Sequence, residues 1–374
     1  RYDGDKDRFH RYLNSDTEEK KNVLTSIAED RSGNIWLGTI NSGLIKFDRS
    51  KDNFTFIRHD PGDSHSLSSD AVISLYSDSS NVLWIGTFND GLSKLDCERK
   101  KFFSLRNLTD GKKNSSKYSV GAILKDKNGD IYFGTDFEGL FKICNDTNMQ
   151  ESIYLKNASS ENPTDQKDQT ILTLLKGDGN ELWAGTLKYG LYEFNSDLNK
   201  SVNYFYTNSD TENQIHSLCR YHNNSGRYLW AGTLSEGLFR FDIEKKLFTK
   251  YTDICNFNRP LSSDRIKCLL TDREGILWIG TDMGGLNSLD PVNAKITHYK
   301  FEKDDPDSVS DNYIISILES GEDVLWIGTM NKGLNRFDKK NKTFRRDTAD
   351  DGLPDNTIRG STEDAAGNLW ISRS

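Results

Sequence analysis

One short segment recurs eight times along the chain and limits the possible folds more than any other feature. It reads Ile35-Trp36-Leu37-Gly38-Thr39 in the first copy and Leu83-Trp84-Ile85-Gly86-Thr87 in the second. The other six copies are centred on Tyr132, Trp183, Trp230, Trp278, Trp326 and Trp370, so all seven tryptophans occupy one position of a repeat that is 44 to 51 residues long. A period of this length is typical of architectures in which each repeat is one supersecondary unit.

Each repeat contains four short strand-like segments, here named A to D, separated by clusters of Gly, Asn, Asp and Ser. In the first repeat they cover residues 23–29, 35–39, 44–47 and 54–59. Helical periodicity is absent. We therefore predict an all-β fold, a β-propeller of four-stranded antiparallel blades that occupies residues 1–374 as a single domain. The A strands that start successive blades are expected near residues 23, 71, 119, 170, 214, 264, 313 and 357.

The repeated residue types have structural explanations. A blade is covered on both faces by its neighbours, so the Trp is expected to pack between blades, next to the Gly two residues later. The Gly of the later Gly-Leu pair, such as Gly43, is expected to close the B–C hairpin with a positive φ. The A–B turns, such as residues 30–34, have the Asp, Asn and Gly of hydrogen-bonded turns and lack the final Glu of a calcium loop.

The two ends of the chain carry complementary parts of a repeat. Residues 1–3 and 9–13 read as the end of a C strand and a D strand, whereas residues 357–363 and 369–373 read as A and B strands. We predict seven intact blades plus a split eighth blade formed by the two termini. The alternative is a seven-bladed ring with a surplus hairpin.

Composition excludes several function classes. The chain has 49 Lys and Arg against 57 Asp and Glu, and a net charge of -8 argues against binding to a nucleic-acid backbone. No apolar run is long enough to span a membrane, and the first residues are neither a signal peptide nor a start methionine, so we expect a fragment of a longer protein. Five cysteines without a C-x-x-C pair and six scattered histidines indicate no metal site, and no cofactor is expected.

Residues 30–48 resemble the two-component regulator propeller repeat, with the pattern Asp-x-x-Gly-Asn-Ile-Trp-Leu-Gly-Thr-x-x-x-Gly-Leu-x-x-Phe-Asp. The resemblance extends over essentially the whole chain and includes connectors such as residues 59–70 and 304–312. It departs at Tyr132, which replaces the Trp, and in the longer connector at residues 156–169.

This resemblance implies a function. Such propellers form the periplasmic sensor domains of hybrid two-component systems that control polysaccharide-utilisation genes. The resemblance further implies a homodimeric parent receptor with a transmembrane helix and a histidine kinase that this segment lacks. We therefore expect a non-enzymatic, periplasmic domain that binds an oligosaccharide and whose only link to the membrane is through the parent protein.

The three-residue B–C loops are the most variable part of the repeat, and variable loops on a fixed scaffold are where binding specificity resides. By strand order they emerge on the same side as the D-to-A connectors. Aromatic rings there can stack on sugars, and polar groups can bind hydroxyls. The expected ligand-binding residues are Asn41, Phe88, Asn89, Asp90, Asp136, Phe137, Glu138, Lys188, Tyr189, Glu236, Asp282, Asn331 and Lys332.

Other interpretations remain open at this point. Each loop residue taken alone also reads as an ordinary solvated turn residue. Basic residues in or beside the connectors could meet an acidic glycan: Lys117, Arg259, Arg265 and Arg359. The alternative functions are a sialidase-like or lyase-like carbohydrate enzyme, for which no constellation that breaks the repeat is evident, and a protein-interaction scaffold.

Overall fold

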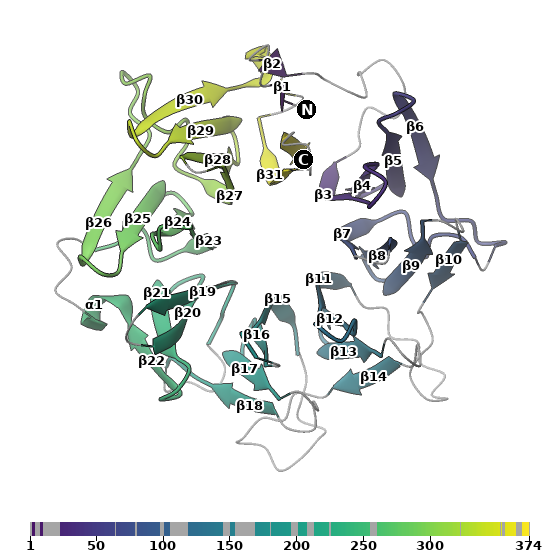
Figure 1. Cartoon of the computed structure of the whole chain (residues 1–374), viewed down its shortest axis with the longest axis horizontal. Coiled ribbons are helices and arrows are strands. Elements are labelled where there is room, and N and C mark those ends of the chain that lie inside the picture. Colours follow the sequence, from purple (N-terminus) through teal and green to yellow (C-terminus); the bar gives the residue numbers. More distant parts are fainter. Residues whose placement is uncertain are drawn as a thin grey trace. The chain divides into compact units, whose positions relative to one another are not determined.

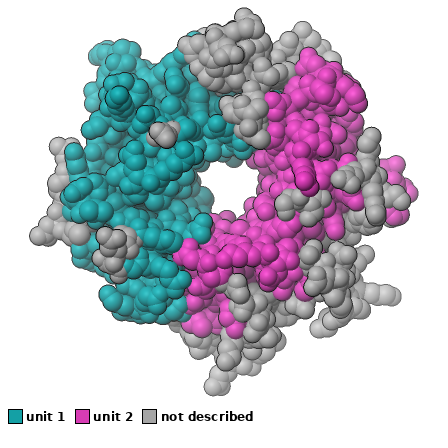
Figure 2. All heavy atoms as spheres, viewed as in Figure 1, with its two compact units in different colours: residues 1–13, 204–374 teal, residues 14–203 magenta. Residues whose placement is uncertain are grey.

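The chain forms small antiparallel sheets that pair strands in sequence order. The computed structural model describes residues 2–3, 8–9, 23–63, 65–78, 81–97, 101–104, 119–144, 150–153, 169–179, 181–195, 201–207, 213–223, 226–254, 260–321, 323–351, 353, 356–363 and 369–373. They separate into two compact units, coloured in Figure 2: residues 1–13 with 204–374 are unit 1, and residues 14–203 are unit 2. That residues 1–374 form a single domain stays a prediction.

Unit 2 contains four four-stranded sheets, which we call blades 1 to 4 (Figure 1). Each is built from a continuous stretch of chain. The strands are β3 (Leu24–Glu29), β4 (Ile35–Thr39), β5 (Leu44–Asp48) and β6 (Asn53–Ile57); β7 (Val72–Ser77), β8 (Val82–Thr87), β9 (Leu92–Asp96) and β10 (Lys101–Ser104); β11 (Val120–Lys125), β12 (Ile131–Thr135), β13 (Leu140–Ile143) and β14 (Gln150–Ile153); β15 (Ile171–Lys176), β16 (Leu182–Thr186), β17 (Leu191–Phe194) and β18 (Ser201–Tyr204), whose last residue belongs to unit 1.

Unit 1 contains blades 5 to 7, which have the same strand order. Their strands are β19 (Ser217–Asn223), β20 (Gly226–Gly232), β21 (Leu238–Asp242) and β22 (Leu247–Lys250); β23 (Ile266–Thr271), β24 (Leu277–Thr281), β25 (Leu286–Asp290) and β26 (Lys295–Tyr299); β27 (Ile314–Ser320), β28 (Val324–Thr329), β29 (Leu334–Asp338) and β30 (Thr343–Asp347). Two short helices, α1 (Tyr251–Ile254) and η3 (Ala349–Asp351), are the helical elements of the described residues, and neither has the length or apolar character to cross a membrane.

Seven complete blades confirm the all-β propeller fold, and the A strands begin one to three residues after the expected positions. The chain ends add two separate two-stranded sheets in unit 1: β1 (Tyr2–Asp3) with β2 (Arg8–Phe9), and β31 (Ile358–Glu363) with β32 (Leu369–Arg373). The first has the C–D register of blade 1, because Asp3 opposes Arg8 as Asp48 opposes Asn53. The split eighth blade stays a prediction, and residues 10–13 of its expected D strand lie outside the described residues.

Neighbouring blades interlock through the glycine of strand B. A Cβ built on Gly38 of blade 1 would lie 2.7 Å from Cγ1 of Val72, the first residue of the next A strand. Beside it, Trp36 is buried in a cluster with Val72 and Leu83 of blade 2, which confirms its predicted position between blades. The glycine therefore makes room for the next blade, and the indole fills the space beside it.

A buried hydrogen bond ties each of several A–B turns to its tryptophan. Oδ1 of Asp30 accepts backbone N–H groups of its own turn, as predicted, while Oδ2 accepts the Nε1–H of Trp36 at 2.8 Å. The same indole-to-carboxylate bond joins Trp84 to Asp78 and Trp278 to Asp272. Sequence reasoning missed this second role of the aspartate, although the constant spacing of six residues was a visible signal.

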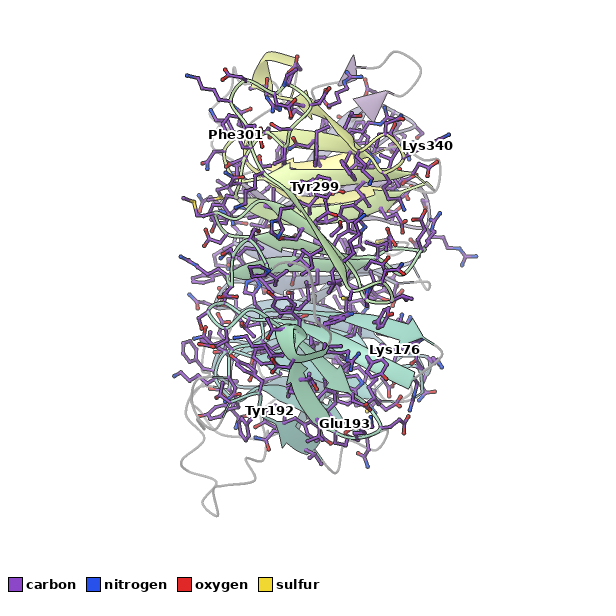
Figure 3. The ribbon with its side chains drawn as sticks, turned by 90° about the vertical axis from the view of Figure 1, so that its left-hand side faces the viewer. Lys176, Tyr192, Glu193, Tyr299, Phe301 and Lys340 are labelled. Carbon is purple, nitrogen blue, oxygen red and sulfur yellow. The ribbon has the colours of Figure 1, made fainter. Side chains whose placement is uncertain are left out.

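Buried lysines extend this arrangement across the junctions between blades. In unit 2, Nζ of Lys125 on blade 3 lies 3.1 Å from Oδ2 of Asp78 on blade 2. In unit 1, Lys339 of blade 7 is 6% exposed and lies 3.4 Å from Asp272 of blade 6 and 3.0 Å from Glu319. Tyr299, marked in Figure 3, packs its ring against Trp278 at the same junction. These two junctions, one in each unit, thus combine apolar packing with ion pairs of low exposure.

Candidate functional site

The seven B–C loops share one scaffold. In each, the Thr of Gly-Thr donates its hydroxyl to the backbone oxygen of the Gly of Gly-Leu, at 2.7 to 3.0 Å. The φ angles of these glycines lie between 73° and 85°, which confirms the predicted positive φ. Three residues between the two fixed ends are therefore free to vary without loss of the hairpin.

Within this scaffold the loops adopt two conformations. In blades 1, 4, 5 and 7, the backbone N–H of the third loop residue donates to the Thr hydroxyl oxygen; these residues are Ser42, Tyr189, Glu236 and Lys332. In blades 2, 3 and 6, the second loop residue instead has a positive φ: 65° at Asn89, 70° at Phe137 and 68° at Met283. Asn tolerates this region, whereas Phe and Met are strained there.

The strained loops also expose large apolar side chains. Phe137 is 64% exposed, Met283 is 76% exposed, and Phe88, which precedes Asn89, is 50% exposed. A bulky residue held in the left-handed region without burial gains nothing from packing to offset the strain. Strain of this kind clusters at ligand-binding sites, so these loops are the strongest candidates for binding.

Hydrogen bonds bring the loops of blades 2 and 3 together in unit 2. The backbone N–H of Asn89 donates to Oγ of Ser119 at 3.3 Å, and the N–H of Asp136 donates to the backbone oxygen of the same serine at 3.1 Å. Ser119 thus bridges two loops of neighbouring blades. We call the resulting surface the unit 2 loop surface; it consists of Phe88, Asn89, Asp90, Asp136, Phe137 and Glu138, six of the thirteen residues expected from the sequence.

The side chains of the unit 2 loop surface are suited to binding a sugar ring that carries hydroxyl groups. Its two phenyl side chains are open to solvent, Glu138 is exposed, and Asp90 and Asp136 are half-buried. The phenyl faces can cover the C–H face of a sugar, while carboxylates accept hydrogen bonds from hydroxyl groups. Because Ser119 is hydrogen-bonded to both loops, their backbone needs little reorganisation when a ligand binds.

The remaining expected residues belong to the B–C loops of the other blades. Asn41, Asn331 and Lys332 are exposed on other loops, and the Glu236 carboxylate lies 3.8 Å from Nζ of Lys250. Lys188 and Tyr189 are half-buried, and Tyr189 packs against the core cluster of blades 3 and 4, so its ring is less open than that of Phe137. Asp282 is buried and ion-paired with Arg265. Lys117 and Arg259 lie outside the described residues.

In blades 1 and 6, the connector to the next blade lies on the B–C side, as strand order predicted. The N–H of Gly43 in blade 1 donates to the backbone oxygen of Asp70 in the connector to blade 2, and the N–H of Gly285 donates to the backbone oxygen of Asn312 in the same way.

Met283 lies in one of the B–C loops identified from the sequence but was not among the expected site residues. Its equivalence to Phe137 is visible when the repeats are aligned.

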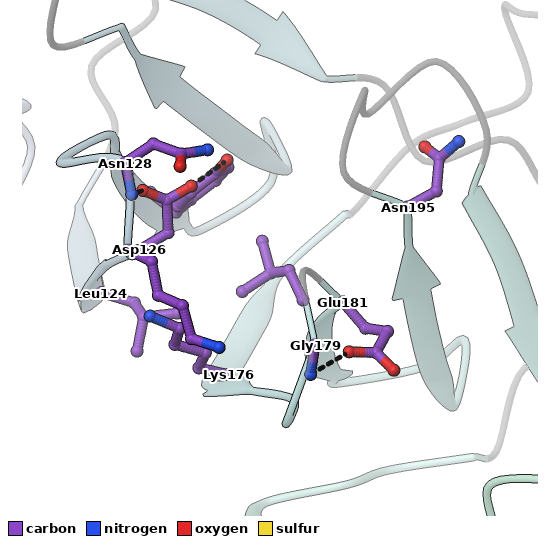
Figure 4. A pocket seen from close by; sticks show the side chains of 10 residues that line it. Leu124, Asp126, Asn128, Lys176, Gly179, Glu181 and Asn195 are labelled. Atoms are coloured by element: carbon purple, nitrogen blue, oxygen red, sulfur yellow. Dashed lines mark hydrogen bonds between the residues drawn. The ribbon is translucent and has the colours of Figure 1, made fainter.

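A small cavity lies on the A–B side of blades 3 and 4, away from the loop surface (Figure 4). Its empty space is about 360 Å³, including space open to solvent. The lining consists of Leu124, Asp126, Lys127, Asn128, Tyr132, Lys176, Gly179, Glu181, Leu182 and Asn195. Two lysines and two carboxylates balance its charge, and the Tyr132 hydroxyl donates to Asp126 at 3.2 Å. Burial, followed by the charge of Asp126, raises the pKa of Tyr132.

Comparisons with solved structures bear on the fold. The computationally designed protein Ika8 is 11% identical over 95% of this chain and 97% of its own, with a TM-score of 0.63. Virginiamycin B lyase from Staphylococcus aureus is 15% identical over 82% of this chain and 92% of its own, with a TM-score of 0.54. At such identities the likeness shows the propeller fold alone. No curated protein matches the chain significantly.

A third structure is the extracellular domain of BT4673 from B. thetaiotaomicron, described as a hybrid two-component system. It is 20% identical over 96% of this chain, with a TM-score of 0.42, and this chain spans 53% of its length.

The sequence comparison with protein families is more specific. The model described as "Two component regulator propeller" matches residues 19–41, 66–89, 260–283 and 308–331. Three of these matches run from the end of a connector through the A and B strands into the B–C loop, so they contain the structural unit described above. The chain therefore contains sequence repeats of the two-component regulator propeller type at these four places.

Proposed function

We propose that this chain is the ligand-sensing domain of a hybrid two-component system, lies outside the cytoplasm in the periplasm, and binds an oligosaccharide through the unit 2 loop surface. The observation that carries the proposal is Phe137, a phenylalanine that is 64% exposed in a left-handed conformation between two acidic residues. The repeat family, which is named for two-component regulators, supports the sensor role.

In this proposal, Phe88 and Phe137 stack on sugar rings, while Asp90, Asp136 and Glu138 accept hydrogen bonds from hydroxyl groups. Ligand bound across loops of blades 2 and 3 would stabilise one arrangement of these blades over another. Such a difference in affinity between two arrangements is what any ligand-driven signal requires. Transmission to a kinase would then depend on a homodimeric parent receptor and its transmembrane helix.

The test is isothermal titration calorimetry of the purified chain against a panel of neutral and acidic oligosaccharides, together with reducing-end assays on the same mixtures. Saturable binding without new reducing ends supports a sensor. New reducing ends would instead establish a carbohydrate-active enzyme, and absence of binding across the panel would favour a protein-interaction scaffold.

The variant Phe137→Gly sharpens this test. Glycine adopts a positive φ without strain, so we expect stability equal to or about 1 kcal/mol above the original chain. Losing a phenyl ring that becomes buried on binding should weaken the ligand at least tenfold, since about 1.5 to 3 kcal/mol accompanies such burial. Leu247→Ala is the control, because Leu247 is 62% exposed on a D strand of unit 1. Unchanged affinity in Phe137→Gly would remove the unit 2 loop surface as the site.

A further inference from the structure

A second group of polar side chains lies at the start of β23 in unit 1, on the B–C side of blade 6. The Nη2 atom of Arg265 lies 2.7 Å from Oδ2 of Asp282, and the side chains are 62% and 6% exposed respectively. The backbone repeats the link, because the N–H of Asp282 donates to the backbone oxygen of Arg265 at 2.9 Å. A buried carboxylate therefore holds an exposed guanidinium in one position.

The anchoring leaves most of the guanidinium available. Arginine carries five N–H donors in a fixed plane. Of the guanidinium nitrogens of Arg265, only Nη2 has a carboxylate partner among the described residues. Asp282 is itself fixed, since Oγ of Ser263 donates to its backbone oxygen at 3.0 Å. Orienting an arginine with a buried acid, while its outer donors face solvent, prepares it to bind a planar anion in a bidentate manner.

Lys267 adds a second cation two residues further along the chain. It is the extra residue of the β-bulge in β23, between Ile266 and Cys268, and is half-buried. Its Nζ lies 5.7 Å from the ring centre of Tyr313, and no described carboxylate is within ion-pair distance of it. A half-buried ammonium without a counter-ion is unfavourable, and an anion bound beside it would relieve that cost.

The described groups next to Lys267 do not supply the missing anion. His216 lies on its other side, where Nδ1 is 3.1 Å from the backbone oxygen of Lys267, and burial followed by the ammonium charge lowers the pKa of His216. The imidazole is therefore neutral at pH 7. The carboxylate of Asp311 accepts the backbone N–H groups of Tyr313 and Asn331.

We propose that Arg265 and Lys267 form a binding site within unit 1 for the anionic substituent, a carboxylate or sulfate group, of an acidic oligosaccharide. The proposal rests on the proposed function and adds the charge class of the ligand. Arg265 and Lys267 place two cations at the start of β23, and of these Arg265 is paired with Asp282, in a chain whose overall charge is -8. Met283, 76% exposed in the adjoining loop, supplies an apolar contact for the sugar ring that carries the anion.

The experiment compares ligands of one sugar type that differ in charge. Neutral galacto-oligosaccharides, oligogalacturonides and sulfated galactan oligosaccharides of equal length are titrated into the purified chain by calorimetry at low and high salt. We expect an acidic ligand to bind at least tenfold tighter than the neutral one, with an advantage that salt reduces. The carboxylated and sulfated arms show which anion is preferred.

Arg265→Gln and Lys267→Gln should each remove most of this advantage while leaving neutral-ligand affinity and the circular dichroism spectrum unchanged. Arg273→Gln is the matched control, since Arg273 is an exposed arginine of the same blade on its A–B turn. Equal affinity for neutral and acidic ligands, or acidic binding that both variants retain, would overturn the anion site and leave the sensor function standing. Binding of none of the saccharides would instead overturn the proposed function.

Discussion

Replacing Asp272 by alanine tests whether the buried aspartates join the blades or merely shape their turns. The carboxylate accepts four hydrogen bonds: Oδ1 receives the backbone N–H groups of Glu274 and Ile276, and Oδ2 receives Nε1–H of Trp278 at 2.8 Å and Nζ of Lys339 at 3.4 Å. Both latter donors are buried, with Trp278 4% and Lys339 6% exposed. If the aspartate only shaped the turn, its loss would affect the first pair alone.

The magnitude follows from these contacts. Leaving the indole N–H of Trp278 buried without an acceptor costs about 1 to 3 kcal/mol, and each lost turn bond costs about 0.5 to 1 kcal/mol. Lys339 keeps its partner Glu319 at 3.0 Å, so its loss is partial and adds about 1 kcal/mol. We expect Asp272→Ala to lower the free energy of unfolding by about 3 to 6 kcal/mol.

Equilibrium unfolding in urea, followed by tryptophan fluorescence and far-ultraviolet circular dichroism, measures this loss. Asp338→Ala is the control. Asp338 is a half-buried turn aspartate whose Oδ1 accepts the backbone N–H groups of Lys340 and Asn341, and its carboxylate accepts no hydrogen bond from a buried indole among the described residues. It should be clearly less harmful than Asp272→Ala. A loss below about 1 kcal/mol for Asp272→Ala, or equal losses in the two variants, would refute the role assigned to the indole and the lysine.

Three further outcomes are expected. Gly280→Ala should lower the free energy of unfolding by about 1 to 3 kcal/mol in urea melts, because its Cβ would lie 2.8 Å from Cγ2 of Ile314. The control Gly121→Ala, which has open space around it, should change this free energy by less than about 0.5 kcal/mol. Equal effects of the two variants would contradict the interlock between blades. Burial raises the pKa of Cys268 to about 12. A variant in which Cys268 is the only cysteine should therefore react with a disulfide reagent at pH 8 after the chain is unfolded and not before. Prompt labelling of the folded chain would argue against the burial of Cys268. A backbone N–H of its turn lowers the pKa of Asp338 below 3.8, so this carboxylate stabilises the folded state above that value and the stabilisation is lost as the pH falls through the lowered pKa. The urea midpoint should therefore drop less between pH 5 and pH 3 in Asp338→Asn than in the original chain, and parallel drops would count against it.

The sequence predicted the blades well because their determinants are local and repeated. Short strand segments, turn residues and the Gly-Leu hairpin each act within a few residues. The interpretation of one repeat therefore applies to all seven blades. The packing of Trp36 between blades could also be anticipated, since a blade has no solvent-facing broad side. The fold was therefore available from residue types and spacing.

The candidate site was only partly predictable. The same Gly-Thr-x-x-x-Gly-Leu frame supports two backbone conformations, and nothing in the frame itself says that Phe137 has a positive φ while Lys188 does not. The sequence also does not show which side chains of different repeats or loops contact each other. The pairing of Lys339 with Asp272 joins residues 67 positions apart, and Arg265 acquires its orientation from a loop carboxylate that looked like a binding residue.

The interlock between strand B glycines and the first residue of the next A strand has a consequence for how such chains can change length. The same contact recurs where Val72 meets Gly38, and where Ile314 meets Gly280. Because these junctions use the same small-to-branched pair, a gene duplication or deletion that adds or removes one whole repeat at them creates no new kind of interface. Recombination between repeats can therefore exchange whole B–C loops, and ligand specificity can change while the buried core stays the same.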